Sequence, residues 1–249
     1  MKTKKNIMGF ITLISIIIVV SSMIATIILS FVITYKYPSA NYVELLQNYF
    51  VFNHIHTFDT ILNIIQGIFI IPSIIGVLLL FRSKVDEKIK NWLVVPTITT
   101  ILGSLLLISL VFLKFKIIFQ LAPEYNIAAG EAKDEIFAIF ENWVKVIFIL
   151  QVVAYVLIFS LGAGIFGIAS FKYQVTKETQ TWLALLCGIL GLCEVGVFIL
   201  GTAGSVFTFL ASIASILFFF WLGGMGLAVI QRIKEKKLEF TEEISVLEA

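Results

Sequence analysis

Charged side chains are scarce in this chain of 249 residues, since Lys, Arg, Asp and Glu together make up only 14% of it. Apolar residues make up 59%, and the mean hydropathy is +1.03. A soluble protein of this length could not hide so much apolar surface from water. The composition therefore excludes a soluble globular protein and indicates a protein of the lipid bilayer.

Several signatures of catalysis and of other partner classes are also missing. The sequence has no glycine-rich phosphate loop, no nucleophile motif and no helical H-E-x-x-H zinc motif. Its two cysteines, Cys187 and Cys193, lie in one apolar run at a spacing that prevents them from pairing on a helix. The net charge of +2 is small, and the basic residues lie where lipid headgroups are expected, so we expect no nucleic-acid partner.

Six long apolar runs fill most of the chain. Each is long enough, as a helix rising about 1.5 Å per residue, to cross a hydrocarbon layer of ~30 Å. We predict an all-α polytopic membrane protein, with one six-helix transmembrane domain over residues 1–230 and a basic and acidic tail over residues 231–249. The expected spans are residues 7–35, 59–81, 93–113, 144–170, 181–200 and 206–230. The first run is too long for a secretion signal, so we interpret it as a retained span; a cleaved signal would leave five.

The basic residues predict an orientation. Thirteen of the eighteen Lys and Arg residues lie at the two chain ends and in the gaps after the second and fourth runs. Because cytoplasmic segments of membrane proteins carry an excess of Lys and Arg, we predict that both termini are cytoplasmic. The expected location is the cell membrane, with the lipid bilayer as the main partner.

Four polar side chains interrupt the apolar runs at a similar depth, roughly 6–10 Å below the predicted outer boundary. They are Asn63, Gln66, Gln151 and Glu194. An acid inside a membrane is costly unless it is paired or protonated, which makes Glu194 a functional candidate. We predict that the four residues bind a small solute or a proton. The alternative is that Glu194 only hydrogen-bonds to Gln151 or to a serine and holds helices together.

A second group lies at the outer start of the second span, where His54, His56 and Asp59 form an H-x-H-x-x-D pattern. Imidazole and carboxylate are zinc ligands, and three of them plus water would make a catalytic site. On a helix, residues 54 and 56 point about 200° apart, so shared ligation requires them to lie in a loop before the helix. Solvated histidines at the membrane interface are the other interpretation. Zinc is thus the alternative to having no cofactor.

Two outer segments are predicted to contain helix of their own. Residues 37–58 carry apolar and aromatic side chains at spacings of three and four, which predicts a short interfacial helix. Residues 136–143 are expected to run straight into the fourth span, with Glu141 and Lys145 placed as an i,i+4 ion pair.

The plan of the chain resembles small six-span prokaryotic membrane proteins of unassigned function. The shared features are six spans, a long outer first loop, a basic second cytoplasmic loop that leads into Thr181-Trp182-Leu183, and a glycine-rich fifth span. The resemblance implies a helical bundle and carries no site residue over. Three functions stay open: a small-solute or proton-coupled carrier, a membrane-embedded metal-dependent hydrolase, and a non-catalytic sensor or assembly protein. We favour the carrier, and therefore a protein that is not an enzyme.

Overall fold

The computed structural model describes residues 2–36, 41–200 and 205–247, which fold into helices joined by short connections. Six helical segments are long and apolar enough to cross a membrane, as the sequence predicts. These segments are Ile7–Leu29, Asn53–Arg82, Ile89–Ile127, Glu131–Tyr173, Glu178–Leu200 and Phe209–Arg232. The chain is therefore an all-helical, multi-pass membrane protein.

Three of the six spans are built from more than one helical element. In chain order the elements are α1 (Lys2–Lys36), α2 (Tyr42–Val51), α3 (Asn53–Arg82), α4 (Glu87–Trp92), α5 (Val94–Lys116), the π-helical η1 (Ile117–Leu121), α6 (Ala122–Ile127), α7 (Glu131–Tyr155), the π-helical η2 (Val156–Gly164), α8 (Ile165–Tyr173), α9 (Glu178–Gly191), α10 (Cys193–Leu200) and α11 (Ser205–Leu247). The fourth span begins at Glu131 rather than at residue 144, and α11 continues through the predicted tail to Leu247. Hydropathy marks only the apolar part of a helix, so it misses these polar ends.

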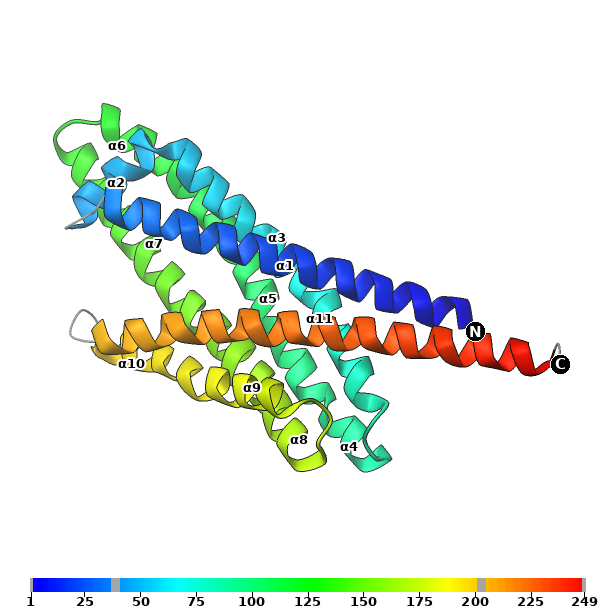
Figure 1. Ribbon diagram of the computed structural model, residues 1–249. Coiled ribbons are helices and arrows are strands. Elements are labelled where there is room, and N and C mark those ends of the chain that lie inside the picture. The colour runs from blue at the N-terminus through cyan, green and yellow to red at the C-terminus, as the bar shows by residue number, and fades with distance from the viewer. Residues whose placement is uncertain (1, 37–40, 201–204, 248–249) are drawn as a thin grey trace.

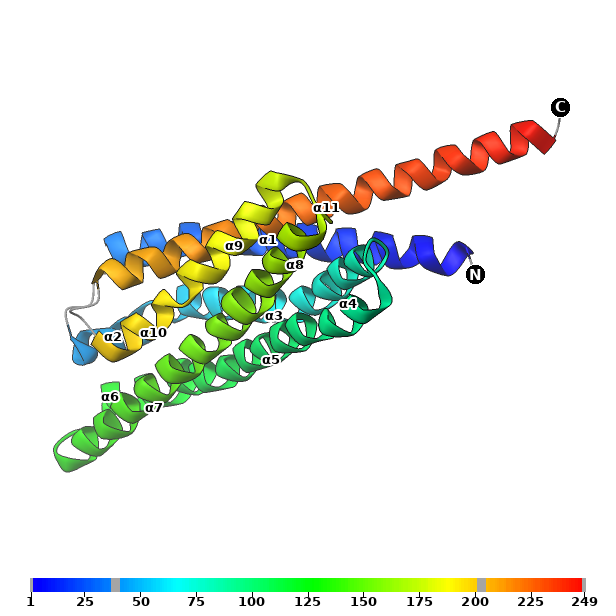
Figure 2. The same cartoon turned by 90° about the horizontal axis from the view of Figure 1, so that it is seen from below.

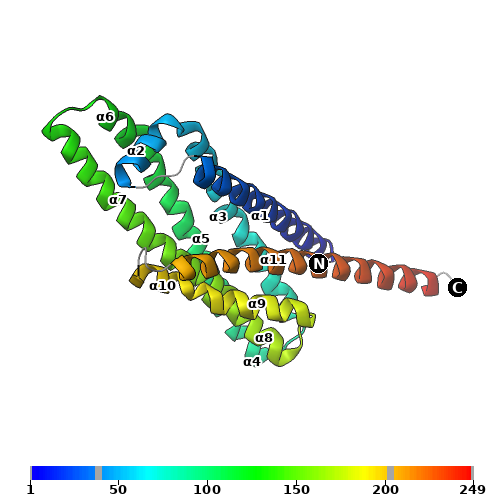
Figure 3. The same cartoon turned by 60° about the vertical axis from the view of Figure 1, so that its left-hand side comes forward.

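The six spans form a closed ring in the order of the chain (Figures 1 and 2). Each span packs against the next one, and α11 returns to pack against α1. Helices α1 and α11 cross near Ile16 and Gly226, where a Cβ on the glycine would lie 3.1 Å from the Ile16 side chain. From this crossing they spread apart toward the start of α11, as Figures 1 and 3 show. The ring is therefore widest in one half of its length.

The two ends of the ring are built from different elements. Helices α2 and α6 pack together at one end, and α4 lies at the other, together with the connection between α8 and α9 (Figure 1). At the α4 end, Lys84 Nζ donates to the Val175 carbonyl at 2.9 Å. Arg232 donates to the Leu80 carbonyl at 3.4 Å and to the Ser83 hydroxyl. Arg232 thus satisfies a carbonyl at the C-terminal end of α3, where the helix dipole favours positive charge, and Lys84 joins this end to the connection between α8 and α9.

Small residues allow the fourth and fifth spans to approach closely. A Cβ on Gly188 of α9 would lie 2.6 Å from the Gly164 Cα of η2, and one on Gly167 would lie 3.0 Å from the Ala184 Cβ. Membrane helices depend on such close backbone contacts because lipid tails are as apolar as the side chains they replace. This contact positions η2, which directly follows Tyr155, and α9, which precedes Glu194; both polar residues are described below.

Candidate functional site

A cavity of about 530 Å³ lies inside the ring, in the half toward α2 and α6, and all six spans contribute to its lining. The four residues that the sequence places at one depth all line it. Among the described residues, the polar side chains that line it are Thr26, Asn63, Gln66, Gln151, Tyr155, Glu194, Ser212 and Ser215. Residues separated by up to 189 positions in the chain therefore meet around one space. That they bind a solute stays a prediction.

The first polar wall of the cavity comes from α1 and α3. Gln66 is buried, and its Nε2 donates to the Thr26 hydroxyl at 2.8 Å, which joins the two helices. Asn63, one turn earlier, donates to the Asp59 carbonyl at 2.8 Å and to the Asp59 carboxylate at 3.3 Å. The N–H donors of both amide groups are thus engaged in hydrogen bonds within the protein. Their carbonyl oxygens can accept hydrogen bonds from a ligand in the cavity.

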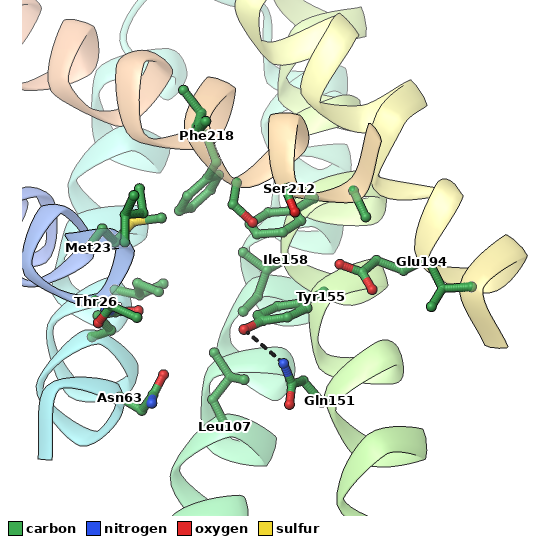
Figure 4. A pocket seen from close by; sticks show the side chains of 18 of the residues that line it. Met23, Thr26, Asn63, Leu107, Gln151, Tyr155, Ile158, Glu194, Ser212 and Phe218 are labelled. Atoms are coloured by element: carbon green, nitrogen blue, oxygen red, sulfur yellow. Dashed lines mark hydrogen bonds between the residues drawn. The ribbon is translucent and has the colours of Figure 1, made fainter. Parts of the chain in front are cut away.

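The second polar wall faces the first across the cavity and comes from α7, α10 and α11 (Figure 4). Gln151 Nε2 donates to the Tyr155 hydroxyl at 3.3 Å, one turn further along α7. The Glu194 carboxylate points from α10 toward Tyr155 and Ser212 (Figure 4). Among the described residues no hydrogen bond or ion pair holds Glu194, and the described partner of Gln151 is Tyr155. The alternative interpretation had Glu194 bonded to Gln151 or to a serine, and neither bond is formed among the described residues.

Two breaks in regular α-helix lie beside these residues, and the sequence analysis predicted neither. The fifth span is interrupted at Leu192, whose N–H bonds to the Ile189 carbonyl at 3.2 Å, and α10 restarts at Cys193. Glu194 thus lies in the first turn of a new helix inside the span. In the fourth span, η2 begins directly after Tyr155. Broken helices and π-helical segments both occur often at functional sites of proteins.

Aromatic side chains close the cavity toward the α4 end. Neighbouring ring centroids lie 5.0–6.1 Å apart along a continuous chain of contacts. In order from the cavity, the chain is Tyr155, Phe159, Phe218, Trp221, Phe166 and Phe81. The last five rings are almost fully buried, so they fill the interior of the ring. We call these five residues the aromatic plug.

The three predicted zinc ligands are not gathered around one point. Both histidines lie inside α3, which begins at Asn53, so the loop that shared ligation required is not formed. His54 is exposed, whereas His56 is buried and packs against Tyr49 of α2, with ring centroids 4.3 Å apart and ring planes tilted by 40°. Asp59 pairs with Lys114 of α5 at 3.8 Å, and that cation would repel a metal ion. Within the described part of the chain, no three His, Cys, Asp or Glu side chains are placed to hold a metal.

The short helix that the sequence predicted within residues 37–58 is present as α2, which packs against α3, α6 and α7 at the end of the ring. Leu46 is fully buried, and the ring of Tyr49 lies 6.3 Å from that of Phe140. Burial raises the pKa of the Tyr49 phenol to about 12, with the Asp59 carboxylate contributing, so the group is neutral at ordinary pH. The predicted Glu141–Lys145 pair is also present, at 2.9 Å.

Thr26, Tyr155, Ser212 and Ser215 are lining residues that the sequence analysis did not assign to the site. Tyr155 could have been found, because it lies four residues after Gln151 and so on the same helix face. Ser212 and Ser215 carry no signal that distinguishes them from small residues that pack between helices. Thr26 carries no signal in its own span and is identified only by its contact with Gln66.

Comparisons with protein-family models, with curated proteins and with solved structures found no match to this chain.

Proposed function

We propose that this protein is a carrier for small solutes, coupled to protons, and that the cavity is its binding site. The main support is that polar groups from five of the six spans converge on one cavity of about 530 Å³, a volume typical of sites for small organic ligands. The unbonded carboxylate of Glu194 is the group that would carry the proton, since acids inside membrane bundles serve in proton relays.

The arrangement of the two ends of the ring fits a carrier in one of its states. The aromatic plug closes the cavity toward the α4 end. A carrier exposes its site to one side at a time by moving parts of the bundle against each other. The break at Leu192 and the π-helical η2 provide places where the fourth and fifth spans can bend.

The metal-dependent hydrolase has no comparable support. His54, His56 and Asp59 lie on one continuous helix, and the Asp59 carboxylate is already paired with Lys114. A sensor would share the cavity with a carrier, and it differs only in not moving the solute across the membrane.

The proposed site is tested by a thermal-stability screen of small solutes on the purified protein and on a variant with a filled cavity. A ligand at 100 times its Kd stabilises a protein by about 2.7 kcal/mol, which raises the Tm by roughly 5–10 °C in a chain of this size. We expect at least one solute to raise the Tm of the wild type by this amount. We expect Ser215→Trp, which places an indole in the cavity, to remove the effect.

The matched control is Ser109→Trp, because Ser109 lies exposed on α5 and does not line the cavity. This variant should respond to the same solutes as the wild type. If each stabilising solute acts equally on Ser215→Trp, or if no solute stabilises the wild type, the cavity is not a solute site.

A further inference from the structure

The cavity contains an acidic side chain without a basic partner. Glu194 is the one carboxylate among its lining residues, and none of those described residues is Lys, Arg or His. The nearest acid on the opposite wall, Asp59, lies one turn beyond Asn63 and is paired with Lys114. A ligand that enters this space therefore meets one acidic group without a basic partner, on a half-buried side chain among apolar neighbours, where attraction between charges is stronger than in bulk water.

Most of the remaining lining is apolar and aromatic. The rings of Phe148, Tyr155, Phe159 and Phe218 face the space, together with aliphatic side chains from α1, α3 and α11. Aromatic faces attract cations through the negative charge of their π-systems, and they also receive the apolar body of an organic molecule. The volume exceeds what a bare metal ion needs, and the described residues supply no set of ligands for one. The apolar and aromatic lining and the acidic group thus favour the same kind of ligand, an organic molecule with a positive charge.

We propose that the cavity takes an amphipathic organic cation, an amine or quaternary ammonium with an apolar body, whose charge lies at Glu194. This inference rests on the proposed function and names its substrate class. The cation and a proton compete for the same carboxylate, so binding releases a proton and one positive charge replaces another. Exchange of this kind couples movement of the cation in one direction to movement of a proton in the other.

Among the described groups around Glu194, no other one is placed to exchange a proton for the cation. From α7, the Tyr155 side chain faces it, and from α11 the neutral Ser212 and Ser215 line the same space. From α9, the buried Cys187 thiol is directed to the Ala214 carbonyl at 3.5 Å. Glu141 and Lys145 on α7 pair with each other. Cation binding should therefore weaken as the pH is lowered.

The test is equilibrium binding of tetraphenylphosphonium to the purified full-length protein, with empty detergent micelles subtracted. Tetraphenylborate serves as a probe of the same shape and opposite charge. We expect the wild type to bind the phosphonium and not the borate. Removing one partner of a desolvated charge pair costs about 2 kcal/mol or more, so Glu194→Gln should weaken phosphonium binding by about thirtyfold or more. The pH dependence should disappear in the same variant.

Two further variants make the result specific. Glu141→Gln makes the same chemical change outside the cavity, at a residue paired with Lys145, and should bind like the wild type. Glu194→Asp keeps the charge on a shorter side chain and should retain part of the binding. This second variant separates loss of charge from loss of the fold.

Three outcomes would overturn the cation assignment: equal binding of borate and phosphonium, full binding by Glu194→Gln, or no binding of the phosphonium to the wild type. In each case the solute screen with Ser215→Trp decides separately whether the cavity binds solutes at all. A neutral or anionic solute that stabilises the wild type and not Ser215→Trp would keep the carrier site while rejecting its cationic substrate.

Discussion

Liposomes that contain the Trp221→Ala variant are expected to lose an imposed pH gradient much faster than liposomes that contain the wild type. Trp221 is 1% exposed and contacts both Phe166 and Phe218 in the aromatic plug. Replacing it with alanine leaves a void between the cavity and the α4 end. A void lined by aromatic rings does not hold ordered water by itself, but it removes the barrier beside the polar cavity, so water of the cavity can pass through it to the far side and carry protons. A pH-sensitive dye inside the liposomes measures the rate.

The same substitution should lower stability. Truncation of a buried tryptophan costs about 3–5 kcal/mol in soluble proteins. In lipid the cost comes from lost dispersion contacts and the void rather than from burial away from water. We expect a Tm lower by roughly 10 °C. Trp182→Ala is the control, because Trp182 is 49% exposed on α9. If Trp221→Ala keeps both the gradient and the Tm of the wild type, the plug does not seal the cavity.

An all-or-none labelling pattern is expected from the orientation that we propose, with the α4 end and both termini in the cytoplasm. The support is the excess of Lys and Arg at that end. In a variant that lacks Cys187 and Cys193, Glu131→Cys should react with an impermeant maleimide on intact cells. Asp86→Cys, in the connection before α4, should react only after the membrane is opened. Both positions are exposed, so access to the reagent depends only on the side of the membrane.

Labelling of Asp86→Cys on intact cells would contradict this orientation and show that the α4 end faces the outside. The description of the cavity and its residues would still hold, but the aromatic plug would then separate the cavity from the outside rather than from the cytoplasm.

The apolar pattern predicts the six spans because each has to be apolar over a length set by the bilayer. It also predicts the depth of Asn63, Gln66, Gln151 and Glu194, since depth depends only on the position along a helix. Their meeting around one cavity additionally requires the ring order of the spans, which hydropathy does not contain. That order follows from contacts such as Gly164 with Gly188.

Local departures from regular helix could not be predicted in the same way. The break at Leu192 follows Gly188 and Gly191, whose flexibility permits a break but does not require one. The zinc interpretation of His54, His56 and Asp59 depended on where α3 begins, and helix starts are poorly defined by apolar pattern alone. The aromatic plug could not be predicted from the sequence either, because its residues resemble any other apolar residues of a membrane span until their partners are known.

Counterflow of a stabilising solute into liposomes tests the carrier most directly. The liposomes contain the purified protein, are loaded with unlabelled solute and are diluted into a trace of labelled solute. A carrier exchanges the two, so we predict transient accumulation of label with the wild type and none with Ser215→Trp. If the solute binds to the wild type but no label accumulates beyond that in protein-free liposomes, the protein is not a carrier, and the cavity belongs to a sensor.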